Sequence, residues 1–440
     1  MTQPVNIDRQ IRQLALPSLA TLLAEPLLVA VDTTMIGHLG ANPLAGLSLA
    51  STILTTLVGV CIFLSYATTA ATARFVGAGK PGLGLRQGLD GMWLAVGLGV
   101  VLGIFLAAGA KFVLGWFGPE ADVLDQAVSY AQASAFGLPG MLLVLAATGT
   151  LRGFADTRTP LIAATIGALA NIPLNAVLIY GVGMGVAGAG AGTALSQTAM
   201  GGYLAWIVRG LARTHEVPLR PSGVGVLSAV RDAVPLIIRT LSLRAAIVLQ
   251  ISAATGLGTL ALAANQIVMT MWNFAAYGLD ALATAAQILV GQGLGSCNRE
   301  RVRLVLHRCL LYGVRVGLAL GVVSAGLAFV IPKVMSTDAE VAWLATQAMW
   351  ITAAAMPVAA VAYMLDGVLI GAGDTRKLAS YMLIALAAFA PVAVFFTGPG
   401  KNWGTPGMLL LWVGYAVIFM SVRGATMRWR IRSDAWMGLK

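Results

Sequence analysis

The sequence predicts an all-α polytopic membrane protein of twelve transmembrane helices arranged as two related six-helix halves. Composition is the first observation: 58% of the 440 residues are hydrophobic and 10% are charged. Mean hydropathy is +0.84. A soluble chain of this length needs more charge to cover its surface, so lipid must be the main solvent here. The apolar runs are also long and continuous, which favours helices over the short alternating strands of a barrel.

A helix needs about 20 mostly apolar residues to cross the hydrocarbon core of a bilayer. Successive runs of that kind predict the membrane spans. The predicted spans are 12–38, 43–73, 88–114, 122–150, 160–181, 186–210, 227–255, 260–290, 307–331, 339–369, 377–397 and 405–424. The first run is too long for the apolar part of a cleavable signal peptide.

The distribution of basic residues predicts the orientation. If both termini are cytoplasmic, the outer loops carry only three basic residues, Lys111, Lys333 and Lys401. The other basic loop residues then lie in the inner loops and in the C-terminal tail, to which Arg423 is assigned. This asymmetry is what the positive-inside rule requires. We therefore expect a multi-pass protein of the plasma (cytoplasmic) membrane, with the lipid bilayer as its surroundings.

The net charge of +11 does not indicate nucleic-acid binding, because the basic residues lie in short loops between apolar spans. The three cysteines and three histidines are scattered, without the spacing of a disulfide framework or a metal site. No cofactor is expected.

The two halves repeat each other. Asp156-Thr157-Arg158 recurs as Asp374-Thr375-Arg376, an offset of 374 − 156 = 218. Pro17 and Pro235 share this offset, and so do Gly40 and Gly258. We predict an N-terminal lobe at 1–212, a cytoplasmic linker at 213–226 and a C-terminal lobe at 227–440 with a basic tail.

Halves with an even number of spans enter the membrane in the same sense, and transporters built this way rock one bundle against the other. The sequence has no nucleophile paired with a base and no set of catalytic carboxylates, so an enzyme is not expected. The loops with Asp156, Arg158, Asp374 and Arg376 are interpreted as helix caps and hinges rather than substrate contacts.

Ionisable side chains inside the membrane are costly and therefore candidates for function. Glu25 and Asp32 lie on span 1, and the seven residues between them turn about 700°, which places both carboxyl groups on one face. Pro26 beside Glu25 should loosen the backbone, and Pro17 is a second hinge candidate. We predict that Asp32 and Glu25 couple a cation to the transport cycle.

Several other polar residues also lie within the predicted spans. Arg239 is expected to extend toward the inner surface, whereas Arg244 lies deeper and needs a carboxylate partner. The candidate partners are Glu25, Asp280 and Asp366. Asn171 and Asn175 share one face of span 5, and Thr193 and Gln197 follow on span 6. They either join helices or line a cavity, and the sequence favours neither.

Several motifs resemble one transporter family. Val31–Gly40, Leu151–Arg158, Asn171–Gly181 and Leu279–Gln292 resemble the multidrug and toxic compound extrusion (MATE) transporters, and more narrowly their DinF-like subfamily. The resemblance covers roughly residues 10–425. It implies two six-helix lobes in a V, alternating access, and export driven by protons or sodium.

The resemblance also implies roles for particular residues. Asp32 matches the principal cation-coupling aspartate, Asn171 the asparagine of span 5, and Thr193 a threonine of span 6. Many relatives carry a second aspartate where this chain has Asn175, and an amide cannot take up a proton. We therefore favour proton coupling through Asp32 over sodium.

The sequence thus favours a monomeric exporter of small amphipathic or cationic organic compounds. The alternative is a flippase for a lipid-linked precursor, which should have a strongly basic central cavity.

Overall fold

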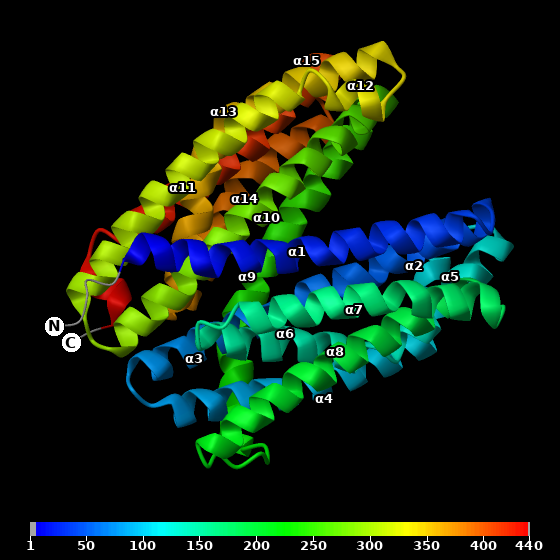
Figure 1. The fold of residues 1–440 in the computed structure, drawn as a ribbon. Helices are drawn as coiled ribbons and strands as arrows, with labels where there is room; N and C mark the ends of the chain where they lie inside the picture. The colour runs from blue at the N-terminus through cyan, green and yellow to red at the C-terminus, as the bar shows by residue number, and fades with distance from the viewer. Residues whose placement is uncertain (1–5, 439–440) are drawn as a thin grey trace. The chain divides into compact units, whose positions relative to one another are not determined.

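The computed structural model describes residues 6–438, apart from the side chains of Glu25, Val224 and Ser228. All regular structure in that range is helical, without a strand (Figure 1). The predicted all-α class is confirmed.

The chain forms two compact units. Unit 2 is Leu16–Val234, and unit 1 combines the chain up to Ala15 with the chain from Pro235 onward. The helices of unit 2 are most of α1 (Ile7–Gly37), α2 (Ala41–Val60), α3 (Phe63–Gly77), α4 (Pro81–Gly115), α5 (Ala121–Ala135), α6 (Leu138–Gly153), α7 (Arg158–Ala176), the π-helical turn η1 (Val177–Gly181) and α8 (Val186–Thr214). Those of unit 1 are most of α9 (Gly223–Gly256), α10 (Thr259–Gly295), α11 (Arg299–Leu327), α12 (Ile331–Met335), α13 (Ala339–Ala372), α14 (Thr375–Thr397), η2 (Lys401–Trp403), α15 (Gly404–Trp412), the π-helical η3 (Val413–Phe419), α16 (Met420–Arg430) and η4 (Asp434–Met437).

The helices coincide with the predicted spans. In the described part of the chain, ten helices are long and apolar enough to cross a membrane, and α5 with α6, bent by 50°, makes an eleventh span. The twelfth predicted span is α8, which has 29 residues but is rich in Gly, Ala, Ser and Thr. Small residues lower its hydropathy and allow close packing against α5, α6 and α7.

The repeated glycines have the same structural task in both halves. Gly40 precedes α2 with φ of 126°, and Gly258 precedes α10 with φ of 108°. A residue with a Cβ rarely adopts such angles, so each tight turn into the second span of a half requires glycine. The turn geometry thus repeats at the offset of 218 that the sequence shows.

The unit boundaries differ from the predicted lobe boundaries, because two helices pass from one unit into the other. The start of α1 belongs to unit 1, where Ile11 and Leu14 are buried and Asp8 lies 3.6 Å from Arg308. The start of α9 belongs to unit 2 as far as Val234. These changes of unit fall beside Pro17 and Pro235, the first pair of repeated residues.

The predicted linker 213–226 is held against α4 of unit 2. Arg86 Nη1 donates to the carbonyl of Pro218 at 2.7 Å, and Trp93 Nε1 donates to that of Leu219 at 2.9 Å. The buried Asp90 carboxylate accepts from the backbone N–H of Ser222 at 2.8 Å. The linker and the first turns of α9 are therefore part of unit 2.

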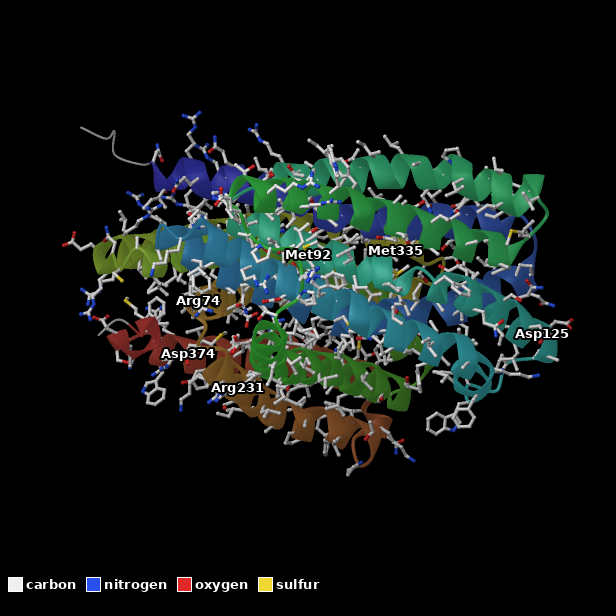
Figure 2. All side chains as sticks on the ribbon, turned by 90° about the horizontal axis from the view of Figure 1, so that it is seen from below. Arg74, Met92, Asp125, Arg231, Met335 and Asp374 are labelled. Carbon is white, nitrogen blue, oxygen red and sulfur yellow. The ribbon has the colours of Figure 1, made fainter. Side chains whose placement is uncertain are left out.

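Charged side chains mark the two ends of unit 2. Figure 2 shows Arg74, near the end of α3, and Asp125, in α5, at opposite ends of the unit. The predicted spans place these residues on opposite sides of the membrane. Which side is cytoplasmic stays a prediction from the positive-inside rule.

Candidate functional site

The first candidate site surrounds Asp32 of α1. This carboxylate is 6% exposed although it lies on a membrane-spanning helix. Pro26 lies within the same helix, six residues earlier, and has no N–H to donate to the helical ladder. A buried carboxylate must find hydrogen-bond donors, and α7 and α8 supply them.

Two neutral side chains donate to Asp32. Asn175 Nδ2 lies 2.6 Å from Oδ1, and Thr193 Oγ1 lies 3.3 Å from Oδ2. Asn171 supports this arrangement, because its Oδ1 accepts from Asn175 Nδ2 at 3.0 Å and its own Nδ2 donates to Ser196 at 3.3 Å. The structure therefore brings together four predicted residues from α1, α7 and α8.

Gly192 permits this close packing of α7 on α8. A Cβ at position 192 would overlap Asn175 Oδ1. That oxygen is buried and accepts no hydrogen bond within the described residues. The site thus contains a carboxylate and, next to it, an acceptor without a donor.

No ion pair to Asp32 is formed by the part of the chain that the structure describes. Nor does that part contain a group of three or more His, Cys, Asp or Glu side chains that could hold a metal ion. Asp32 is the carboxylate of a hydrogen-bonded cluster whose other members, Asn171, Asn175 and Thr193, are neutral.

Sequence reasoning missed three residues near this site. Tyr130 of α5 is buried and close enough to Asp32 and Thr193 to interact with both. Tyr180 of the π-helical turn donates to the carbonyl of Met35 at 2.5 Å and so joins the ends of two helices. Ser196 accepts from Asn171. Each is a polar residue within an apolar span, which is the signal that could have singled it out.

Two predicted residues are not placed in the cluster. Gln197 forms no hydrogen bond to it among the described residues, and Ser196, its neighbour, does so instead. The side chain of Glu25 lies outside the described residues, and its role in coupling stays a prediction.

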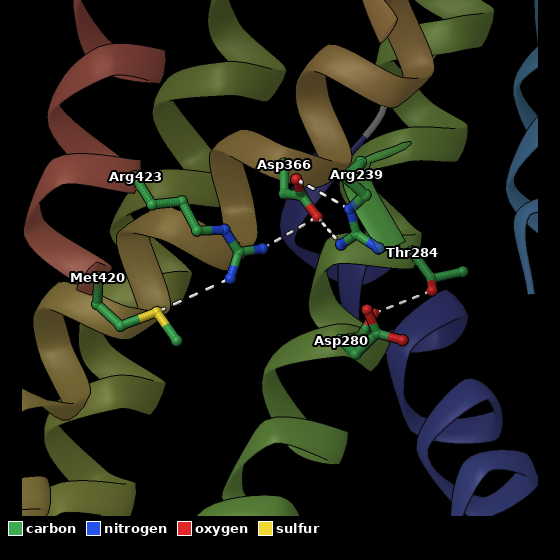
Figure 3. A network of polar contacts seen from close by, with 6 residues as sticks. All are labelled: Arg239, Asp280, Thr284, Asp366, Met420 and Arg423. Carbon is green, nitrogen blue, oxygen red and sulfur yellow. Dashed lines mark hydrogen bonds and ion pairs between the residues drawn. The ribbon is translucent and has the colours of Figure 1, made fainter. Parts of the chain in front are cut away.

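A second buried polar cluster lies in unit 1 (Figure 3). Asp366 of α13 pairs with Arg239 of α9, whose Nε lies 3.5 Å from Oδ1, and with Arg423 of α16, whose Nη2 lies 3.1 Å from Oδ2. The Arg423 guanidinium also lies 4.7 Å above the centre of the Tyr363 ring. One carboxylate therefore faces two cations.

This cluster corrects two expectations. Arg239 does not extend to the inner surface: it is 4% exposed, because Asp366 compensates its charge within the unit. Arg423 does not belong to a cytoplasmic tail: it is fully buried, because the last helix continues through η3 to Arg430. The hydropathy pattern ends before the helix does.

Arg244 and Asp280 are the other two candidate charged residues of unit 1 that the sequence predicts inside the membrane. Arg244 is exposed, and the described residues offer it no ion pair. Asp366, one of its predicted partners, is occupied by the two other arginines. Asp280 of α10 is half-buried near the cluster, where its backbone carbonyl accepts from Thr284 at 2.9 Å.

The repeated Asp-Thr-Arg loops have diverged. Asp156 caps α7, since its Oδ1 accepts from the backbone N–H of Arg158 at 3.1 Å and of Thr159 at 3.0 Å. Asp374 precedes α14 but instead pairs with Arg430 at 2.6 Å. Arg158 and Arg376 are both exposed.

Comparisons with known proteins agree with this fold. The MatE family profile matches residues 17–177 and again 235–395, an offset of 235 − 17 = 218. The Arabidopsis thaliana protein DETOXIFICATION 44, chloroplastic, is 28% identical over 98% of this chain and 84% of its own length. The Escherichia coli DNA damage-inducible protein F is 28% identical over 98% of this chain and 94% of its own length. A crystal structure of a MATE protein in the bent conformation superposes with a TM-score of 0.88 at 20% identity, covering 98% of this chain and 97% of that one.

Proposed function

Because the chain belongs to the MatE family, as a DinF-like MATE transporter, we propose that it exports small amphipathic organic compounds, cationic ones included, in exchange for protons. The family and the membrane fold support the general class of transporter. The ion and the kind of compound belong to the proposal.

The observation that carries the proposal is the buried Asp32 carboxylate with only neutral donors around it. A carboxyl group can gain or lose a proton, whereas the amides of Asn171 and Asn175 and the hydroxyl of Thr193 cannot do so near neutral pH. No neighbouring cation in the described residues fixes its charge. The site can therefore change by one unit of charge during a transport cycle.

Protonation of Asp32 would rearrange its contacts. An ionised carboxylate only accepts, but a protonated one also donates. Asn175 Oδ1 is the adjacent buried acceptor without a donor, so rotation of the Asn175 amide would let it accept from the new O–H. Because Asn175 belongs to α7 and Asp32 to α1, proton binding would alter how these helices pack.

We propose protons rather than sodium because the site holds a single carboxylate. The family resemblance implies that Asn175 stands where many relatives have a second aspartate, so one negative charge is available to offset a bound cation. Asp32, Asn171 and Thr193 do offer oxygen atoms, which is why the test below includes sodium.

The flippase alternative receives little support from unit 1. A pyrophosphate group needs several free cations, but Arg239 and Arg423 already share Asp366. We propose that the protein works as a monomer in the plasma membrane with both termini cytoplasmic.

The test is dye efflux from proteoliposomes under an imposed pH gradient without sodium. Native protein should drive efflux, and Asp32→Asn should abolish it. The matched control is Asp125→Asn, an exposed carboxylate of the same unit, which should transport like the native protein. If native protein moves no dye under either a proton or a sodium gradient, the exporter proposal fails.

A further inference from the structure

The end of α1 is held by a side chain from another helix. α1 ends at Gly37, so its last carbonyl groups have no N–H partner further along the helix. His38 Nδ1 lies 2.7 Å from the carbonyl oxygen of Thr34. The carbonyl of Met35 instead accepts from the hydroxyl of Tyr180 at 2.5 Å, and Tyr180 belongs to the π-helical turn η1. A contact between residues 145 positions apart therefore closes this end of the helix.

The π-helical turn explains why Tyr180 reaches α1. On a regular α-helix, the five residues from Asn175 to Tyr180 turn about 500°, which leaves the two side chains about 140° apart. In η1 the N–H of Val182 donates to the carbonyl of Val177, five residues earlier, at 2.8 Å. A turn closed by this wider bond contains about one residue more than an α-helical turn, so residues five apart face the same side. Asn175 and Tyr180 therefore both contact α1.

Apolar packing supports the same contact. Ile36, which follows Met35, is fully buried, and Ile179, which precedes Tyr180, is 2% exposed. Both belong to one apolar core of unit 2. Gly188 of α8 allows the backbone of η1 to approach closely, since a Cβ at this position would lie 2.9 Å from the backbone nitrogen of Ile179. η1 thus packs on α8 while Tyr180 binds α1.

Two hydrogen bonds hold one face of α1. Asp32 and Met35 are three residues apart and lie on the same face of the helix. Asn175 binds the Asp32 carboxylate, and Tyr180 binds the carbonyl of Met35. Both oxygens of Asp32 accept hydrogen bonds, as those of an ionised carboxylate do. The position that Tyr180 stabilises is therefore the one in which ionised Asp32 receives its donors.

We propose that Tyr180 is a positioning residue, which clamps the end of α1 to η1 and thereby sets the pH dependence of transport through Asp32. The inference rests on the proposed export function and deepens it. Loss of the Tyr180 hydroxyl weakens the arrangement that favours ionised Asp32, so the protonated arrangement competes with it at a higher pH.

Other titratable groups lie near this clamp. Tyr130 of α5 is close to Asp32, but a tyrosine titrates far above neutral pH. His38 follows α1 and contacts Thr34, and a histidine does titrate near neutral pH. Glu25 lies on the same helix, seven residues before Asp32. The experiment therefore includes a variant without the His38 imidazole.

The experiment compares the pH profiles of native protein and Tyr180→Phe. Dye efflux from proteoliposomes is measured at a fixed pH difference over a series of absolute pH values. The profile of Tyr180→Phe should shift upward by up to about one pH unit, which corresponds to the net free energy of one hydrogen bond. The same shift should appear when Tyr180→Phe is made in a His38→Gln background. Gly188→Ala, which displaces η1 but keeps the hydroxyl, should shift the profile in the same direction.

Tyr203→Phe is the matched control. Tyr203 lies on α8 of the same unit and is 41% exposed, compared with 49% for Tyr180. Its ring stacks with that of Trp206 at 6.3 Å between ring centres, and its hydroxyl has no hydrogen-bond partner in the described part of the chain. The profile of Tyr203→Phe should match that of native protein. An unchanged profile in Tyr180→Phe, a shift to lower pH, or an equal shift in Tyr203→Phe overturns the proposal.

Hydrogen exchange separates this proposal from the export function on which it rests. Mass spectrometry follows amide exchange at the end of α1 in nanodiscs, where no gradient or dye is present. Tyr180→Phe should exchange there about fivefold faster than native protein, and Tyr203→Phe should not. Unchanged exchange in Tyr180→Phe refutes the clamp whatever the efflux result. If native protein moves no dye, the role in transport fails together with the proposed function, whereas faster exchange still confirms the contact.

Discussion

Unit 2 and unit 1 each bury a carboxylate on a membrane-spanning helix, but they surround it differently. Asp32 of unit 2 accepts from an amide and a hydroxyl. Asp366 of unit 1 faces the guanidinium groups of Arg239 and Arg423. A carboxylate with neutral donors can be protonated without leaving a cation unpaired. Protonation of Asp366 would leave two buried arginines, Arg239 and Arg423, without their counter-charge. The comparison suggests a titrating group in one unit and a structural one in the other.

The internal repeat makes this difference sharper. Asp32 corresponds to position 32 + 218 = 250, which is the fully buried Gln250. Asp366 corresponds to 366 − 218 = 148, which is Thr148. Neither carboxylate has a copy in the other half, so the halves share a backbone plan but not their charged chemistry.

The largest effect on stability should come from Asp366→Asn. Removing the carboxylate leaves Arg239 and Arg423 buried without their counter-charge, which should cost about 3–5 kcal/mol. Thermal unfolding of the purified protein, followed by tryptophan fluorescence, measures this loss. The triple variant Arg239→Met, Asp366→Leu, Arg423→Met should recover most of it, and a triple variant as unstable as Asp366→Asn would contradict the interpretation of a charge cluster.

Gly192→Ala tests the packing that positions Asn175. Its Cβ would overlap Asn175 Oδ1, and such overpacking typically costs about 1–3 kcal/mol. We expect reduced gradient-driven efflux, because Asn175 can no longer donate to Asp32 in the same geometry. Gly202→Ala is the control on the same helix, since no atom lies within 4 Å of the added Cβ. Equal efflux by the two variants would show that the position of the Asn175 side chain does not affect coupling.

Much of the architecture could be predicted because hydropathy and repeats report on the backbone. The apolar runs located the helices, and the offset of 218 reappears in the two family matches. Long-range pairing could not be predicted in this way. Arg423 was assigned to the tail because the apolar run ends there, and its partner Asp366 lies on another helix. In the same way, the contact between Asn175 and Asp32 joins residues 143 positions apart.

The linker provides an intermediate case, in which Asp90 has one cation and one neutral donor. Its carboxylate lies 3.8 Å from Arg86 and accepts from Ser222 N–H. Asp90→Ala should lose about 0.5–1.5 kcal/mol, the net value of a hydrogen bond. Gly225→Ala should be destabilising on its own, because its Cβ would overlap Asp90 Oδ2. The double variant Asp90→Ala, Gly225→Ala should lose less stability than the sum of the two single losses. A loss equal to that sum would show that Asp90 does not hold the linker.

The smallest effect on stability should come from Asp32→Asn, although its effect on efflux should be complete. An asparagine at position 32 still offers an oxygen to Asn175 Nδ2, and its own amide can donate to Thr193 Oγ1, which also accepts. No cation among the described residues loses a partner, so the change in unfolding free energy should stay below about 1 kcal/mol. Thermal unfolding and efflux measured on the same preparation test both expectations. A large loss of stability would place Asp32 in the structural class of Asp366 and remove the contrast between the two units.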